Sequence, residues 1–337
     1  MYHILRGLLL MAVSVSALAM AAADSTFTYI PQIHATLRPR LEVATESGEY
    51  RFQMRNARLV ISGYAARPVD YFINIDLCDR GKMKILDAWG RLAVSRQFRV
   101  QAGQFRMPFG IDPFRAPHQY YFANRSFIGK QMCNYRSVGA KLDYMPVSGL
   151  NLEFGVFNPT AIGDHEVWSK KLAYAGRAVF TPGAWKFATG YMSIRPHGVR
   201  ANLIDATAGW SAGRWIVEGE YMYKHYVHAS HVAAHAYSIF ADYRMPIHAG
   251  YFNRLSFQGR FDGLTDHSDS SVNADGLLYT TDHARNRITV GSTISYIHSK
   301  SVFVDFRIDY EKYFYSHGFK ADAADGDRIV AELVFRF

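Results

Sequence analysis

Polar and apolar residues alternate along most of the chain beyond residue 30, with the period of two that is typical of half-exposed β-strands. Near the C-terminal end, for example, Val304, Phe306 and Ile308 alternate with Asp305 and Arg307. We predict sixteen such strands, which indicates an all-β fold. Their centres lie near residues 38, 57, 73, 89, 102, 140, 153, 176, 190, 206, 219, 240, 258, 291, 308 and 331.

The connections between these segments alternate between short turns and long loops. Short turns are predicted at 67–68, 95–97, 146–149, 182–183, 211–213 and 298–300, and long loops at 107–134, 158–170, 195–202, 225–232, 263–284 and 316–327. One turn, Pro246–Asn253, is longer than this rule predicts. Short turns on one rim and long loops on the other are typical of transmembrane β-barrels, whose tilted strands cross the bilayer in about ten residues.

A soluble β-sandwich would also alternate apolar and polar residues, so the content of the polar face decides between the two folds. That face often carries opposite charges close together, as in Glu218, Glu220 and Lys224, which suits a water-filled lumen. The chain also ends on an alternating strand, and its last residue, Phe337, is similar to the terminal Phe of outer-membrane barrels. We therefore predict a transmembrane antiparallel β-barrel of about 16 strands.

Two further features of this barrel follow from its pattern. Closure hairpin by hairpin should place both chain termini on the rim that carries the short turns. On the last strand, the alternation predicts that Leu333 and Phe335 face lipid, whereas Arg328 and Glu332 face the lumen.

The first 23 residues have the pattern of a secretory signal peptide. Arg6 precedes the apolar stretch Gly7–Met20, and small residues at 21–23 suit cleavage. No run of 18 apolar residues follows, so no transmembrane helix is predicted. We expect residues 1–23 to be removed and residues 24–337 to form one barrel domain in the outer membrane of a Gram-negative bacterium.

The long loop after the fifth predicted strand, residues 107–134, is rich in aromatic residues, which a disordered linker would lack. Pro108 cannot continue a strand ladder and Gly110 permits a sharp turn, so we expect the loop to fold into the lumen and narrow it. Cations at such a constriction would select anions, whereas an ordinary surface loop is the alternative. The candidate anion-binding residues are Arg106, Arg115, Arg125 and Lys130.

Basic residues outnumber acidic ones, with 38 Lys and Arg against 29 Asp and Glu. This balance favours small anionic solutes as partners, or serves only solubility. An inward arginine could bind phosphate or carboxylate through two N–H groups, but it could equally neutralise an inward carboxylate on a neighbouring strand. The candidate lumen cations on strands are Arg58, Arg91, Lys141, Arg260 and Arg307, with Arg177, Arg287, Arg328 and Arg336.

Other kinds of site have weaker support in the sequence. The four histidines from His225 to His235 would share a face only on a helix, and they fall in a predicted loop, so neither a metal site nor another cofactor is predicted. No nucleic-acid-binding motif accompanies the positive charge. Cys78 and Cys133 could pair in an oxidising compartment, but the sequence leaves their separation open.

A motif at the end of the fifth predicted strand resembles a known family. Residues 103–110, Gly-Gln-Phe-Arg-Met-Pro-Phe-Gly, are similar to the Gly-Gln-x-x-x-Pro-Phe-Gly signature of the phosphate-selective porin O and P family. The resemblance extends over roughly residues 30–160, and the later half matches only in pattern and in its terminal Phe. Further segments that resemble the family, in its order, are 55–59, 71–76, 86–89, 125–126, 136–139 and 156–158.

The resemblance implies a sixteen-stranded channel that assembles as a homotrimer in outer-membrane lipid, with a constriction loop after the fifth strand. Inward arginines and lysines bind phosphate in the best-known members, but the matched motif does not contain those residues. We therefore expect a porin that passes small solutes and prefers anions, with phosphate as a candidate ligand. The alternatives are an outer-membrane lipid hydrolase, for which no nucleophile elbow is present, and an adhesin or structural barrel without an open pore.

Overall fold

The computed structural model describes residues 28–79, 81–159, 168–196, 198–316, 318–319, 321–323 and 325–337. The predicted signal peptide, residues 1–23, lies outside the described residues. Within the described part of the chain, no helix is both long and apolar enough to cross a membrane.

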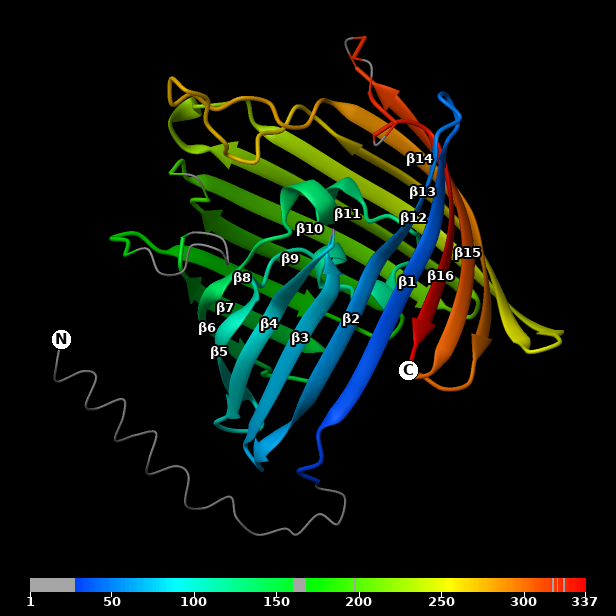
Figure 1. Ribbon diagram of the computed structural model, residues 1–337. Helices are drawn as coiled ribbons and strands as arrows, with labels where there is room; N and C mark the ends of the chain where they lie inside the picture. Colours follow the sequence, from blue (N-terminus) through cyan, green and yellow to red (C-terminus); the bar gives the residue numbers. More distant parts are fainter. Residues whose placement is uncertain are drawn as a thin grey trace.

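Sixteen antiparallel strands form a closed barrel in the described part of the chain, which confirms the predicted fold (Figure 1). Every strand pairs with its neighbours in sequence, and β16 pairs with β1 to close the ring. Each predicted strand centre falls inside one of these strands. They are β1 (Gln32–Ala44), β2 (Tyr50–Ala66), β3 (Val69–Asp79), β4 (Lys82–Ala93), β5 (Phe98–Arg106), β6 (Arg136–Tyr144), β7 (Leu150–Phe157), β8 (Ala173–Phe180), β9 (Trp185–Ile194), β10 (Ala201–Ala212), β11 (Trp215–Tyr226), β12 (Ala234–Ala249), β13 (Phe252–Leu264), β14 (Arg285–Ile297), β15 (Phe303–Tyr315) and β16 (Arg328–Arg336).

The two ends of the described chain meet on the rim that carries the short turns. The backbone N–H of Ala35 donates to the carbonyl oxygen of Phe337 at 2.7 Å. Side chains on β16 alternate as expected: Leu333 is exposed on the outer face, whereas Glu332 is buried against Arg38 inside the barrel.

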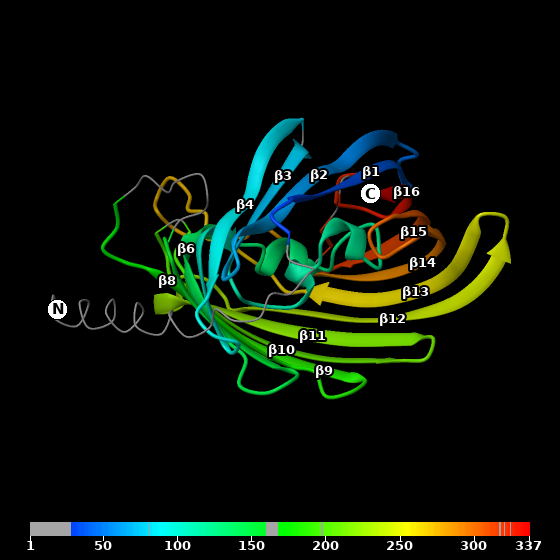
Figure 2. The ribbon, with the colours of Figure 1, turned by 90° about the horizontal axis from the view of Figure 1, so that it is seen from below.

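The connection between β12 and β13 differs from the sequence-based expectation. Instead of a long turn over Pro246–Asn253, the two strands continue to Ala249 and Phe252 and are joined by a short turn in which Gly250 has a φ of 60°. A register shift between Pro246 and Ala249 absorbs the proline, which cannot donate to the ladder. The hairpin therefore extends as a two-stranded ribbon beyond the rim of the barrel (Figures 1 and 2).

The segment between β5 and β6, residues 107–135, folds into the barrel, and we call it the lumen loop. Figure 2 shows it as the teal segment enclosed by the strands. It contains three short helical turns, η1 (Asp112–Phe114), η2 (Pro117–Gln119) and the π-turn η3 (Ile128–Met132). The prediction that this loop folds inward is confirmed by its hydrogen bonds to inward-facing side chains of the wall.

The two cysteines do not form a disulfide. Cys78 lies on β3, whereas Cys133 is buried in the lumen loop, and both are free thiols. The possibility of a disulfide that the sequence left open is thereby excluded for this structure.

Candidate functional site

The lumen loop turns inward directly after β5. Gly110 has a φ of 72°, a conformation that other residues adopt only with strain. The next two backbone N–H groups, of Ile111 and Asp112, donate to the carboxylate of Glu220 on β11 at 2.7 and 3.2 Å. The turn at Gly110 is thus fixed to the wall at β11. A Cβ added to Gly110 would lie 3.1 Å from Oε1 of Glu220, which is a tight contact.

One side of the lumen loop packs against an apolar part of the inner wall. Phe109, Phe127, Ile128 and Met132 are almost completely buried. The wall residues of this cluster come mainly from β7 to β13 and include Phe157, Ala173, Ala175, Met192, Ile194, Leu203, Met222, Ala234, Ala236 and Leu264. Apolar side chains therefore fill the space between this side of the loop and the wall, and they exclude water from it.

Carboxylates of the wall accept hydrogen bonds from the backbone of the lumen loop. Asp309 on β15 accepts from the N–H of Ala123 at 2.6 Å, and Asp262 on β13 accepts from the N–H of Phe127 at 3.0 Å. These bonds satisfy backbone donors that would otherwise be buried without partners, which costs about 1–3 kcal/mol each.

Arginines of the wall donate to the carbonyl groups of the same loop. Arg307 donates to the carbonyl of Tyr120 at 2.7 Å, and Arg260 donates to that of Asn124 at 2.9 Å. Both guanidinium groups are buried and paired with acids as well, Arg307 with Glu332 at 3.2 Å. These two predicted lumen cations therefore lie inside the barrel and fix the loop.

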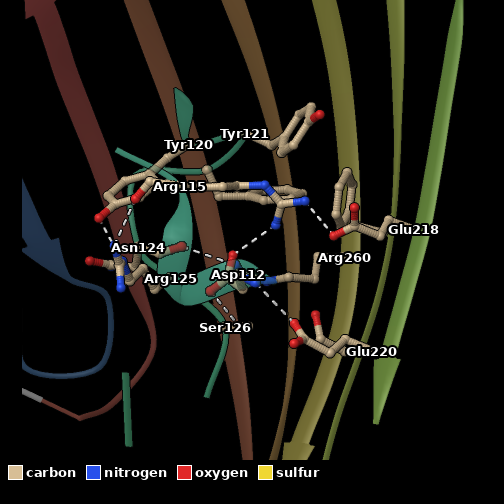
Figure 3. Close-up of a pocket in the computed structure, with 13 residues that line it drawn as sticks. Asp112, Arg115, Tyr120, Tyr121, Asn124, Arg125, Ser126, Glu218, Glu220 and Arg260 are labelled. Atoms are coloured by element: carbon tan, nitrogen blue, oxygen red, sulfur yellow. Dashed lines mark hydrogen bonds and ion pairs between the residues drawn. The ribbon is translucent and has the colours of Figure 1, made fainter. Parts of the chain in front are cut away.

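Arg115, a predicted anion-binding residue, is paired with two acids. Its guanidinium contacts Asp112 at 3.0 Å within the loop and Glu218 on β11 (Figure 3). Burial alone would lower the pKa of Arg115, but the two carboxylates raise it above its ordinary value. In the same way, burial alone would raise the pKa of Asp112, but Arg115 and Arg125 hold it below its ordinary value.

Arg125 bonds within the lumen loop itself. Its Nε donates to the hydroxyl of Tyr120 at 2.5 Å, and its Nη2 donates to the carbonyl of Arg115 at 2.9 Å (Figure 3). The same Nη2 donates to the carbonyl of Pro113 at 3.2 Å. The side chain thus ties three parts of the loop together, while its positive charge remains beside the open half of the lumen.

The other two predicted loop cations differ in exposure. Arg106, the last residue of β5, is buried and donates to Oδ1 of Asn134 at 2.9 Å. The Lys130 side chain is 53% exposed, and its Nζ lies 3.9 Å from Asp325. Unlike Arg115, neither is enclosed by two carboxylates.

Three further strand cations of the prediction are paired with acids of the same or a neighbouring strand. Arg58 lies 3.2 Å from Asp76, and Arg91 lies 2.6 Å from Asp70. On β6, Lys141 contacts Asp143 of the same strand and Glu153 of β7, each at 2.7 Å. The geometry therefore matches the alternative in which strand arginines and lysines neutralise inward carboxylates.

A large cavity opens between the lumen loop and the wall formed by β1, β2 and their neighbours, and we call it the cationic chamber. Its volume is about 650 Å³. Among the described residues that line it, twelve basic side chains face two carboxylates, Asp76 and Asp325. The basic residues are Arg38, Arg40, Arg51, Arg55, Arg58, Lys84, Arg106, Arg125, Lys130, Arg136, Arg287 and Arg328.

The wall behind the cationic chamber compensates part of this charge. Glu42 pairs with Arg40 at 2.6 Å and with Arg51 at 2.5 Å, and Asp87 pairs with Arg136 at 2.9 Å. The carboxylates lie toward the strands, so the chamber itself presents mainly guanidinium and ammonium groups.

The sequence-based prediction missed several residues of the chamber. Arg38 and Arg40 are two residues apart on β1, and Arg51 and Arg55 lie on the first half of β2. The signal that could have identified them is this spacing by even numbers, which places cations on the inner face of adjacent strands. On β2 the pattern is broken by a register shift opposite Leu37–Pro39, which hides the inward face from a simple period of two.

The histidines between 225 and 235 do not meet around a common centre. His225 lies on β11, His228 and His231 in the following connection, and His235 on β12, where it contacts Tyr221. Among the described residues, no group of three or more His, Cys, Asp or Glu side chains is arranged to hold a metal ion.

Solved structures with the same architecture are outer-membrane porins. An anion-selective porin from Comamonas acidovorans has a TM-score of 0.62 and 11% identity, over 91% of this chain and 99% of that chain. OmpT of Vibrio cholerae, solved in a trimer form, has a TM-score of 0.59 and 11% identity, over 91% of this chain and 99% of that chain. The outer membrane channel DcaP of Acinetobacter baumannii has a TM-score of 0.60 and 11% identity, over 91% of this chain and 97% of that chain. At these identities the likeness shows the fold.

The sequence comparisons identify the family. No curated protein matches the chain. The profile of the family "Phosphate-selective porin O and P" matches residues 38–216, just over half of the chain, and this span includes the resembling motif at 103–110. The chain belongs to the phosphate-selective porin O and P family and is a channel protein of the Gram-negative outer membrane.

Proposed function

We propose that this channel prefers anions and that the cationic chamber holds small oxyanions of the phosphate type on their way through the barrel. The observation that carries the proposal is the excess of twelve basic side chains over two carboxylates around one cavity of about 650 Å³. Phosphate suits this site because guanidinium groups match its geometry with paired N–H donors and stay charged at every physiological pH.

The position of the chamber strengthens the electrostatic argument. The lumen loop and the barrel wall enclose it, so charges inside it are screened less by salt than charges on an open surface. A rim of fixed cations in such a narrow place attracts anions and repels cations. The ion pairs behind the chamber hold the guanidinium groups in place, so an entering anion finds them already oriented.

The four loop cations have different roles in this proposal. Arg106, Arg125 and Lys130 line the chamber and act directly on anions. Arg115 does not line it, and its two ion pairs with Asp112 and Glu218 assign it to fixing the loop. Replacing Arg115 would therefore disturb the loop as well as the charge.

We also propose that three copies of the chain assemble in the membrane. OmpT of Vibrio cholerae, a barrel with the same fold, has been solved in a trimer form. Cross-linking of the protein in outer-membrane vesicles, followed by denaturing electrophoresis, tests the assembly: a ladder that ends at three chains supports it, and a single band of one chain contradicts it.

Block of the chloride current by phosphate tests whether the cationic chamber binds this anion. The purified protein is inserted into a planar bilayer in KCl, and phosphate is added to one side. We expect a saturating decrease of the current, and Arg58→Gln should weaken the block because Arg58 lines the chamber beside Asp76. Arg99→Gln, on β5 and outside the chamber lining, is the control. If phosphate leaves the current unchanged, the chamber does not hold this class of anion.

A further inference from the structure

The connection between β13 and β14 forms a small hairpin that folds inward at the rim opposite the chain termini. Two isolated antiparallel bridges, His267 with Asp282 and Val272 with Leu278, define it. We call residues 265–284 the mouth hairpin; it is the gold segment along the long-loop rim in Figure 1. Although it is a loop at a rim, His267 is completely buried.

His267 links the mouth hairpin to the inner wall through three buried groups. Its Nδ1 lies 3.1 Å from Oδ2 of Asp282, and its Nε2 lies 3.1 Å from Nζ of Lys224 on β11. Lys224 also donates to the carbonyl of Ser268 at 2.7 Å and is completely buried. With Lys224 as an ammonium group, which only donates, Nε2 accepts and Nδ1 carries the proton that is donated to Asp282. This set of contacts fits a neutral imidazole in one tautomer.

Other groups around His267 also join the hairpin to the barrel. On β11, the Tyr226 hydroxyl donates to the carbonyl of Ser268 at 2.6 Å and accepts from its N–H at 2.9 Å. The charged groups around His267 are Lys224, Asp269, Asp282 and Arg285. Of these, Arg285 on β14 donates to Asp282 at 3.0 Å. Further titratable neighbours are Asp266, which accepts from the N–H of Ala284 at 2.8 Å, and His231, whose Nε2 lies 3.3 Å from the Thr280 hydroxyl. Tyr135 in the lumen loop packs on the buried cluster with Tyr226.

We propose that the Asp282–His267–Lys224 relay is a pH-sensitive latch, which holds the mouth hairpin on the inner wall at neutral pH and releases it when His267 takes up a proton. A protonated Nε2 can no longer accept from Lys224, and two buried cations would then lie about 3 Å apart without a carboxylate between them. Withdrawal of the hairpin would separate these charges and return both side chains to water.

The direction of the pH dependence follows from the burial of the ring. Burial lowers the pKa of His267, and although Asp282 acts in the opposite sense, the result stays below the ordinary value. In a released hairpin the ring would titrate near its ordinary value of about 6.5. The released form thus binds the proton more tightly, so the latch is fully stable above about pH 6.5 and weakens as the pH falls below it.

Release of the latch would affect the ion current because the mouth hairpin packs against the inner wall. Leu278 packs against the buried cluster that also contains Phe127, Ile128 and Met132 of the lumen loop. A released hairpin would move at the mouth while the lumen loop keeps its own bonds to Glu220, Asp262 and Asp309. We expect steady single-channel current at neutral pH and flickering current at acidic pH.

Hydrogen exchange of the wild-type protein in lipid vesicles tests the latch. Deuterium uptake is measured for peptides from 265–284 between about pH 7.5 and about pH 5.5, and it is corrected for the intrinsic dependence of exchange on pH. One titrating group changes an equilibrium at most tenfold per pH unit, so we expect up to about tenfold faster corrected exchange for each unit below about 6.5. Peptides from 107–134 should show no such change. Uniform corrected exchange of the hairpin over this range would overturn the proposal.

Three variants separate His267 from its neighbours. His267→Gln keeps a neutral polar side chain but cannot titrate, so the acid-induced exchange should disappear. Lys224→Met removes the opposing cation, so release should require a lower pH, and this variant carries the test if the first fails to fold. His231→Gln should behave as the wild type. If His231→Gln abolishes the response, or His267→Gln retains it, His267 is not the proton acceptor.

Discussion

The guanidinium of Arg38 on β1 lies 2.6 Å from the carboxylate of Glu332 on β16, and both side chains are almost completely buried. The two residues are 294 positions apart in sequence, and their pair crosses the seam that closes the barrel. The same arginine donates to the carbonyl of Ala123 in the lumen loop at 2.7 Å. One side chain therefore connects the closure of the barrel with the position of the loop.

This pair predicts a large loss of stability when its charge is removed. Glu332 also accepts from Arg307 at 3.2 Å, so Glu332→Gln would leave two buried guanidinium groups without their carboxylate. We expect a loss of about 3–5 kcal/mol in the free energy of unfolding, measured by urea titration in lipid vesicles. Asp70→Asn, which breaks the more exposed pair with Arg91, should cost less than about 1 kcal/mol. Equal losses in the two variants would contradict a special role of the seam.

The two faces of the barrel predict opposite responses to an added arginine. Leu333 lies on the outer face of β16, and Leu333→Arg should cost up to about 2–4 kcal/mol, the cost of an arginine facing lipid at the bilayer midplane. Gln53 lines the cationic chamber and donates to Glu42 at 2.8 Å, so Gln53→Arg would meet water and a carboxylate and should cost little. The same urea titration compares the variants, and a larger loss for Gln53→Arg would indicate that the faces are reversed.

The elbow of the lumen loop predicts a position-dependent effect of alanine. At Gly110 the φ of 72° and the nearby Glu220 oppose a side chain, so Gly110→Ala should cost about 1–2 kcal/mol from backbone strain alone. A Cβ on Gly90 of β4 would meet no atom within 4 Å, so Gly90→Ala should be neutral or slightly stabilising. The free energies of unfolding of the two variants provide the comparison, and a tolerated Gly110→Ala would argue that the elbow is not strained.

The strands were predictable because each carries its own pattern, but the environment of the loop cations was not. Alternation of apolar and polar residues is local, and it located every strand. Arg115, in contrast, pairs with Glu218, 103 positions away, and the carbonyl of Arg125 accepts from Arg287, 162 positions away. Such partners depend on the closed ring, so the residues next to these cations in sequence do not reveal them.

Breaks in the period of two explain two further differences. The register shift opposite Leu37–Pro39 concealed the inward arginines of β2. The shift at Pro246–Ala249 allowed β12 and β13 to continue past a proline that had indicated a turn. Both are irregularities that insert or skip a residue, and the side-chain pattern alone does not mark where they occur.

The zero-current potential across a planar bilayer with a KCl gradient tests most directly whether the cationic chamber sets the preference for anions. We predict that the wild type prefers chloride over potassium. Arg51→Glu combined with Lys130→Glu reverses two chamber charges on half-exposed side chains, and it should shift the potential toward cation preference. Lys170→Glu combined with Lys171→Glu makes the same change of charge on an exposed loop and should leave the potential nearly unchanged. A cation-selective wild type, or a potential that the chamber variant leaves in place, would contradict the account.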